Sequence, residues 1–153
     1  HLRVIFTGRV TDDNRAFHAA QLARLTAASV ADRVQFLGEI PWEDVVRHYQ
    51  ALDLFVAPAR WEGFGLTPLE AMACGCLLIG SNTPPVTEFI EDGKNGLLVD
   101  FFNIKGLADR ACEALSKPKK FLDQRENARR LIVESYDLRT KCVPNLLRLI
   151  AGK

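Results

Sequence analysis

Residue types and spacing that could do chemistry gather in the segment from Glu62 to Glu70. Gly63 and Gly65 carry no side chain, so the backbone between them can approach a ligand closely. A helix that begins directly after such glycines offers unpaired N–H groups and roughly half a positive charge at its N-terminus. A diphosphate fits that environment without a metal ion or a lysine at this position. The segment therefore predicts a site for a ligand that carries a diphosphate.

The two glutamates that bound this segment each have a simpler explanation. Thr67, Pro68 and Glu70 form a Thr-x-x-Glu capping box with proline at the first helical position. In that role Glu70 contributes on the order of 1 kcal/mol to stability and need bind nothing. Glu62 lies in the preceding loop and could be a solvated loop carboxylate. Spacing alone leaves both alternatives open.

Hydrophobic periodicity predicts the elements that must position the segment. Five short apolar runs predict strands at residues 2–7, 34–37, 54–57, 77–79 and 97–99. Helices are expected at about 14–29, 42–49, 68–74, 86–90, 104–115, 118–134 and 138–150. Asn14 is expected to cap the first of these helices and Asp137 the last, which Pro144 should kink.

Strands separated by helices predict an α/β fold, a Rossmann-like parallel sheet with helices on both faces. Residues 54–57 are nearly all apolar, as in a strand covered on both faces. Ligands of such sheets bind beyond the carboxyl ends of the strands. The loops after Gly8, Leu37, Ala57 and Ile79 are therefore expected to form the floor of the site.

Composition excludes several other classes of protein. The 153 residues suit one domain, and 48% hydrophobic with 25% charged residues is ordinary for a soluble globular protein. Twenty Lys and Arg against nineteen Asp and Glu argue against a nucleic-acid binder with broad basic charge. No apolar run is long enough to span a membrane. The four cysteines are expected to be reduced thiols, and the three unclustered histidines to be non-catalytic.

The segment resembles the signature of the large retaining family of GT-B glycosyltransferases, in which two Glu flank Gly-Phe-Gly-Leu-x-x-x. Beyond the two glutamates, the matching residues of the signature are Gly63, Phe64, Gly65 and Leu66. The match continues through Gly75, and residues 34–38, 53–58 and 91–99 follow the family's pattern in the same order. The resemblance implies that residues 1–153 are the nucleotide-sugar donor-binding domain, one half of a GT-B fold.

The resemblance also implies a role for each matching residue. Glu62 would be the catalytic residue, in contact with hydroxyls of the donor sugar near the reacting carbon. Backbone amides from Phe64 to Thr67 would hold sugar hydroxyls and the diphosphate, and Glu70 would bind the ribose hydroxyls. The nucleotide base would lie near three residues that would contact it mostly through backbone: Gly38, Glu39 and Ile40.

The implied reaction is transfer of a sugar from a nucleotide-diphosphate donor with retention at the anomeric carbon. No cofactor or metal is expected, because stabilising the charge of the leaving nucleoside diphosphate is the main catalytic work. The expected acceptor is a sugar or a lipid-linked acceptor in polysaccharide or glycoconjugate biosynthesis, bound through a missing N-terminal domain. No nucleic-acid partner is expected. The expected location is cytoplasmic, including peripheral attachment to the inner face of the membrane.

The chain departs from the family's pattern in two places. Residues 83–88 keep Glu88, but Pro84 and Pro85 remove two N–H donors from a loop that is usually Gly-Gly-x-Pro-Glu. Upstream, only one helix fits between Gly8 and Val34, so Gly8 matches the end of the family's second strand and Arg9 a rim residue. The first strand would then be absent.

In the strand order 3-2-1-4-5-6, losing strand 1 leaves residues 2–7 and 54–57 without a neighbour on one side. The two strands could pair directly, a second copy could supply a strand in a swapped homodimer, or the strand lies upstream. We favour the last of these, because the chain starts without Met close to a strand.

Two other interpretations compete with an enzyme's donor-binding half. The chain could be a non-catalytic module that binds a nucleotide or nucleotide-sugar, or an unrelated α/β nucleotide-binding domain in which both glutamates are incidental. A second α/β domain upstream would favour the enzyme.

Overall fold

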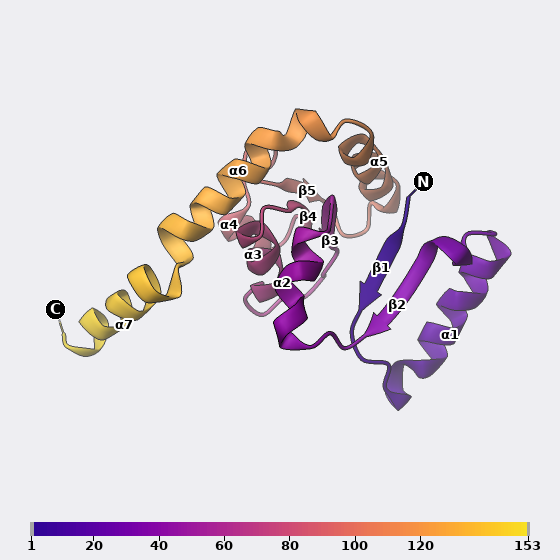
Figure 1. Cartoon of the computed structure of the whole chain (residues 1–153), viewed down its shortest axis with the longest axis horizontal. Helices are drawn as coiled ribbons and strands as arrows, with labels where there is room; N and C mark the ends of the chain where they lie inside the picture. The colour runs from indigo at the N-terminus through magenta and orange to yellow at the C-terminus, as the bar shows by residue number, and fades with distance from the viewer. Residues whose placement is uncertain (1, 153) are drawn as a thin grey trace. The chain divides into compact units, whose positions relative to one another are not determined.

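The computed structural model describes residues 2–152 and divides the chain into two compact units, residues 1–45 and residues 46–153 (Figure 1). Strands and helices alternate as expected. Each pair of neighbouring strands within residues 2–152 is parallel. The predicted Rossmann-like α/β class is therefore confirmed. Each unit is described by itself.

The first unit contains the parallel pair β1 (Val4–Thr7) and β2 (Val34–Gly38), joined by α1 (Asp12–Ala27) and the 3₁₀ turn η1 (Ala31–Arg33). Phe6 and Phe36 stack across the pair with ring centroids 5.1 Å apart, and His18 of α1 meets the Phe36 ring edge-on at 4.5 Å. Asn14 does not cap α1. It is the third residue of the helix, and its Oδ1 accepts a 2.8 Å hydrogen bond from the N–H of the capping residue, Thr11, as part of a capping box.

The second unit is built on the parallel sheet β3 (Leu54–Ala57), β4 (Leu77–Ser81) and β5 (Leu97–Val99), in that order. Helix α2 (Trp42–Gln50) leads into it from the first unit. The helices that follow are α3 (Leu66–Ala73), α4 (Val86–Phe89), α5 (Ile104–Ser116), the 3₁₀ turn η2 (Pro118–Phe121) and α6 (Leu122–Leu131).

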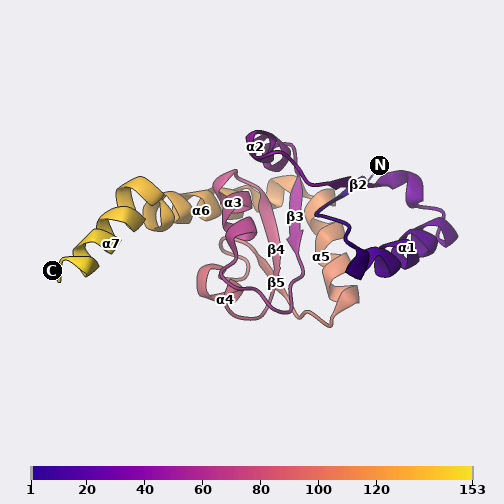
Figure 2. The same ribbon diagram turned by 90° about the horizontal axis from the view of Figure 1, so that it is seen from below.

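Helices cover both faces of this sheet. Figure 2 shows α3 and α4 on one side of the strands and α5 on the other. Leu78 of β4 packs with the first group, whereas Leu77 and Ile79, which alternate with it, pack towards α5. All three are buried, and the two resulting cores fix the carboxyl end of β4 beside those of its neighbours.

Strand β3 is less covered than its sequence suggests. Val56 is 37% exposed and the other three residues are half-buried, so the expectation of cover on both faces is wrong for this strand. The physical reason is its position, since β3 pairs with β4 on one side only, whereas β4 is paired on both sides and buried at every residue.

The expected helix at 118–134 is interrupted, because a 3₁₀ turn precedes α6 and a π-helical segment, η3 (Ile132–Tyr136), follows it. A second π-helical segment, η4 (Leu138–Cys142), leads into α7 (Val143–Ile150). Asp137 caps this region as expected, with Oδ1 accepting a 2.7 Å hydrogen bond from the N–H of Thr140. The helix expected at 138–150 is unbroken, but its geometry changes from π to α at Val143, directly before Pro144.

Strands β1 and β3 belong to different sheets, one in each unit. The observed neighbours, β1 with β2 and β3 through β5 in sequence, are those expected from the order 3-2-1-4-5-6 without its strand 1. Within residues 2–152 there is no helix of the length and apolar character needed to cross a membrane.

Candidate donor site around helix α3

The loop after β3, residues 58–65, is organised by the carboxylate of Glu62. Its Oε1 accepts hydrogen bonds from the backbone N–H groups of Gly63 at 3.1 Å and Gly65 at 3.3 Å. The side chain is half-buried, and within residues 2–152 its Oε2 makes no hydrogen bond. Glu62 is therefore not a merely solvated carboxylate. One oxygen shapes the loop, and the other is open to a ligand.

Gly65 determines where α3 begins. It is the residue that precedes the helix, it is buried, and its φ of +84° lies in the left-handed region that favours glycine. A Cβ added there would lie 2.9 Å from Cζ of Phe89, so α4 packs directly against this backbone.

The predicted capping box is wrong. The chain enters the helix at Gly65, so Thr67 and Pro68 are the second and third residues of α3, and no side chain caps it. Pro68 still lies in the first turn, where the N–H it lacks has no partner within the helix. Glu70 is consequently free of the capping role that competed with ligand binding.

The N-terminus of α3 presents free donors to solvent. The N–H groups of Leu66 and Thr67 have no hydrogen-bond acceptor within the part of the chain that the structure describes, and both residues are exposed. Unpaired N–H groups and the positive end of the helix dipole favour an anion at this position. The diphosphate expected at this position stays a prediction.

Glu70 lies one turn further along α3 and contacts α2. Its Oε2 accepts a hydrogen bond from the hydroxyl of Tyr49 at 3.1 Å, and its Oε1 has no partner within residues 2–152. Tyr49 is buried, and burial together with the neighbouring Glu70 carboxylate raises the pKa of its hydroxyl well above the ordinary value of 10.0. The hydroxyl therefore stays protonated and donates to the carboxylate at any working pH.

The opposite end of α3 is held by two arginines of α6. Nε of Arg125 donates to the carbonyl of Gly75 at 2.7 Å, and Nη1 of Arg129 donates to the carbonyl of Ala73. Cationic side chains are favourable where helix carbonyls are left without intrahelical partners. Together with Gly65 at its start, these contacts fix the position of α3.

The three residues expected near the nucleotide base lie at the end of β2, in the first unit. Gly38 has a φ of +70° and its carbonyl accepts from the N–H of Gly8 at 2.8 Å. Glu39 forms an exposed ion pair with Arg9 at 2.6 Å, which agrees with a rim position for that arginine. An open groove of about 870 Å³ lies beside them, lined by both glycines, both ion-paired residues, and α1.

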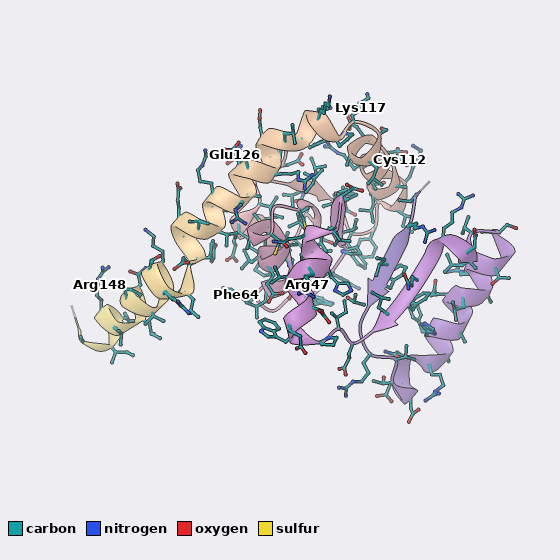
Figure 3. The ribbon with its side chains drawn as sticks, viewed as in Figure 1. Arg47, Phe64, Cys112, Lys117, Glu126 and Arg148 are labelled. Carbon is teal, nitrogen blue, oxygen red and sulfur yellow. The ribbon has the colours of Figure 1, made fainter. Side chains whose placement is uncertain are left out.

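Several large aromatic side chains are exposed on the loop that carries Glu62 and just after β5. Trp61 is 83% exposed, and the guanidinium of Arg60 lies 5.4 Å from the centre of its ring and 5.5 Å from that of Phe102, which follows β5. Phe64, labelled in Figure 3, is also exposed. Glu88 is exposed on α4, after the Pro84–Pro85 pair, which has a cis peptide bond.

Sequence reasoning brought together the residues of the loop and of α3, but it missed Tyr49, Arg125 and Arg129. Tyr49 stands on the predicted apolar face of its helix, where it reads as a core residue. The two arginines lie more than fifty residues after the loop, on a helix that reads as generally charged. Only the tertiary fold places these side chains on α3.

Other candidate chemistry is absent from the described residues. All four cysteines are free thiols, as expected. Burial raises the pKa of Cys76 from 9.0 to about 11 and raises that of Cys74 as well, so neither is an activated nucleophile. Residues 2–152 contain no cluster of three or more His, Cys, Asp or Glu side chains suited to a metal ion. The expected independence from metal is not tested by this observation.

Comparison with known proteins identifies relatives of this chain. Residues 3–131 match the sequence model of the family described as Glycosyl transferases group 1. The chain is 41% identical over 109 residues to the lipopolysaccharide core biosynthesis mannosyltransferase LpsB of Rhizobium meliloti, covering 70% of this chain and 30% of that protein. It is 37% identical over 134 residues to the mannosyltransferase LpcC of Rhizobium leguminosarum bv. viciae, covering 88% of this chain and 38% of that protein. The chain thus spans about a third of the length of these curated relatives.

Solved structures share the fold. Anabaena Alr3699/HepE, crystallised in complex with UDP, superposes with a TM-score of 0.92 at 22% identity, covering 99% of this chain and 41% of that one. The C-terminal domain of the group 1 family protein LpcC from Francisella tularensis superposes with a TM-score of 0.81 at 23% identity, covering 91% of this chain and 87% of that one.

Proposed function

The chain belongs to the family Glycosyl transferases group 1, and on that premise we propose that it is the donor-binding part of a retaining hexosyltransferase. The whole enzyme moves a sugar from a nucleoside diphosphate sugar to a sugar or lipid-linked acceptor. The observation that carries the proposal is the start of α3, where the free N–H groups of Leu66 and Thr67 stand between two carboxylates that each have an open oxygen.

Each part of this site has a task in the proposed reaction. The N–H groups and the helix dipole stabilise the negative charge that develops on the leaving diphosphate. Glu62 Oε2 binds hydroxyls of the donor sugar near its anomeric carbon, and Glu70 Oε1 accepts from the ribose hydroxyls. Gly38, Glu39 and Ile40 contact the base. In the transfer, the bond from the anomeric carbon to the diphosphate oxygen breaks, the acceptor oxygen bonds to that carbon, and the proton of the acceptor hydroxyl passes to the leaving diphosphate.

The reaction is proposed to need no metal ion, since the amides and the dipole supply the positive potential. Two of the relatives above are named mannosyltransferases of lipopolysaccharide core biosynthesis, which makes GDP-mannose the first donor to test. A non-catalytic binding module remains the alternative, and it would bind the donor without turning it over.

The test uses the full-length protein and a panel of UDP, GDP, dTDP and ADP sugars. Calorimetry is expected to find one preferred nucleotide. Release of the nucleoside diphosphate from that donor should require an added acceptor. NMR of the product should show the donor's anomeric configuration retained, and excess EDTA should leave the rate unchanged. If the protein binds a donor but forms no product with any acceptor tested, the result would support the non-catalytic binding module. If no nucleotide binds, both the enzyme and the binding module would be overturned.

A further inference from the structure

Three contacts hold Tyr49, one each at its ring, its backbone carbonyl and its hydroxyl. Only the contact of the hydroxyl involves the proposed site. Its ring packs edge-to-face on Phe55 of β3 at 5.5 Å. Its carbonyl accepts a hydrogen bond from the thiol of Cys76 at 3.0 Å. Its hydroxyl then donates to Glu70 at 3.1 Å. The first two contacts hold the side chain and backbone in place, so the hydroxyl is a fixed donor rather than a mobile one.

The hydrogen bond is specific for one oxygen of Glu70. It uses Oε2, whereas Oε1 makes no hydrogen bond within residues 2–152. A glutamate on a helix has three side-chain torsions, and a carboxylate that is held at one oxygen loses most of that freedom before a ligand arrives. The remaining oxygen is then presented in one direction.

We propose that Tyr49 is a positioning residue for nucleotide binding: its hydroxyl holds Glu70 Oε2 so that Oε1 faces the ribose hydroxyls of the donor. This inference rests on the proposed function, because it takes the ribose as the ligand of Glu70. Tyr49 touches no ligand itself and acts only through the carboxylate. Burial keeps the hydroxyl protonated, so it donates to Oε2 of Glu70. Oε1 of Glu70 then accepts from the ribose hydroxyls.

The test measures nucleotide affinity of the full-length protein by calorimetry for the wild type, Tyr49→Phe, Glu70→Gln and the double variant. The probes are the preferred nucleoside diphosphate of the UDP, GDP, dTDP and ADP panel and its 2′,3′-dideoxy form. Tyr49→Phe removes one oxygen and keeps the ring against Phe55, so folding should be preserved. The matched control is Tyr136→Phe, at the only other tyrosine of the chain.

Tyr49→Phe is expected to raise the dissociation constant for the ribose nucleotide by about three- to tenfold, the net effect of one typical intramolecular hydrogen bond, because Tyr49 acts on the ligand only through Glu70. The double variant should bind no more weakly than Glu70→Gln alone, because both changes act through one carboxylate. The dideoxy nucleotide should bind wild type and Tyr49→Phe with equal affinity, and Tyr136→Phe should match the wild type throughout.

Two results would overturn the inference: wild-type affinity of Tyr49→Phe for the ribose nucleotide, or equal weakening of the ribose and dideoxy nucleotides, which would mark a general structural role. Failure of the underlying function looks different. In that case Glu70→Gln would also leave the ribose nucleotide's affinity unchanged, or no nucleotide would bind.

Discussion

Glu62 has one carboxylate oxygen for the fold and one for the proposed ligand. Its Oε1 satisfies two loop amides, those of Gly63 and Gly65, while Oε2 makes no hydrogen bond within residues 2–152. A carboxylate has enough acceptor sites for both tasks. Substitutions at position 62 should therefore separate the loop-shaping role from the ligand-binding role, because some keep an acceptor oxygen for the loop and others do not.

Glutamine at position 62 keeps one acceptor oxygen for the loop but replaces the open carboxylate oxygen by an amide N–H₂. Glu62→Gln should leave the affinity for free nucleoside diphosphate within about twofold and weaken the nucleotide-sugar by about tenfold, because hydroxyls donate better to a carboxylate. Glu62→Ala removes both oxygens, so it should weaken both ligands. Calorimetry with the two ligands checks this, and equal affinity of wild type and Glu62→Gln for the nucleotide-sugar would contradict it.

Cys76 is expected to make the free energy of unfolding depend on pH in the alkaline range. Its thiol is buried, donates to the carbonyl of Tyr49, and has its pKa raised by burial from 9.0 to about 11. The folded state therefore holds this proton more tightly than the unfolded state. Its contribution to stability is complete below pH 9 and is lost as pH rises towards 11.

Urea unfolding of wild type and Cys76→Ala across this pH window measures the effect. The free energy of unfolding should fall less steeply with pH in Cys76→Ala, by up to about 1.4 kcal/mol for each pH unit. Cys112→Ala, at an exposed thiol, serves as the control and should keep the wild-type slope. Parallel slopes for all three proteins would show that Cys76 does not titrate differently on unfolding.

Among the elements, α3 carries the proposed donor site, and its start depends on a backbone conformation. Gly65 has a φ of +84° and leaves no room for a Cβ beside Phe89. Gly63, two residues earlier, has no such φ, and a Cβ there would meet no atom within 4 Å. Position 65 therefore requires glycine for its backbone conformation and its packing, whereas position 63 does not, although the two glycines stand two residues apart in the same signature.

Gly65→Ala should destabilise the protein by about 1–3 kcal/mol, the usual cost of a non-glycine residue held in a sparsely populated backbone region. It should also weaken nucleoside diphosphate binding, because the N–H groups of Leu66 and Thr67 follow directly. Gly63→Ala is the matched control and should change stability by less than about 0.5 kcal/mol. Thermal and urea unfolding with calorimetry check both, and similar losses in the two variants would argue against a special role for the left-handed φ.

The same helix shows what sequence could predict at the level of elements. Periodicity located all five strands and most helices, because apolar runs and amphipathic faces depend on nearby residues. The start of α3 was misplaced by two residues, because Thr67 to Glu70 satisfies the local capping rule while the turn is decided by packing of Gly65 against Phe89. Likewise, spacing could not find Tyr49, since its contact with Glu70 exists only in the tertiary fold.

For the whole molecule, each sheet ends on strands that are paired on one side only, among them β1 and β3. Unpaired strand edges favour association with another strand. The strand-swapped homodimer and the strand contributed from upstream both stay predictions. Sedimentation of the full-length protein and of residues 1–153 separates them, because only a swap predicts a dimer of the full-length protein.

Residues 1–153 alone should bind nucleotide but catalyse no transfer. The features proposed to hold the donor lie within this chain, whereas the chain spans about a third of the length of its curated relatives. Two-domain sites close around both substrates and exclude water, and a donor half by itself leaves the sugar open to solvent without a bound acceptor. We expect calorimetry to find the nucleotide preferred by the full-length protein bound by residues 1–153. No glycosylated product should appear above background under conditions in which the full-length protein makes it readily. Nucleotide binding serves as the control for folding, so product formation at a rate comparable to the full-length protein would show that the acceptor is bound by these 153 residues after all.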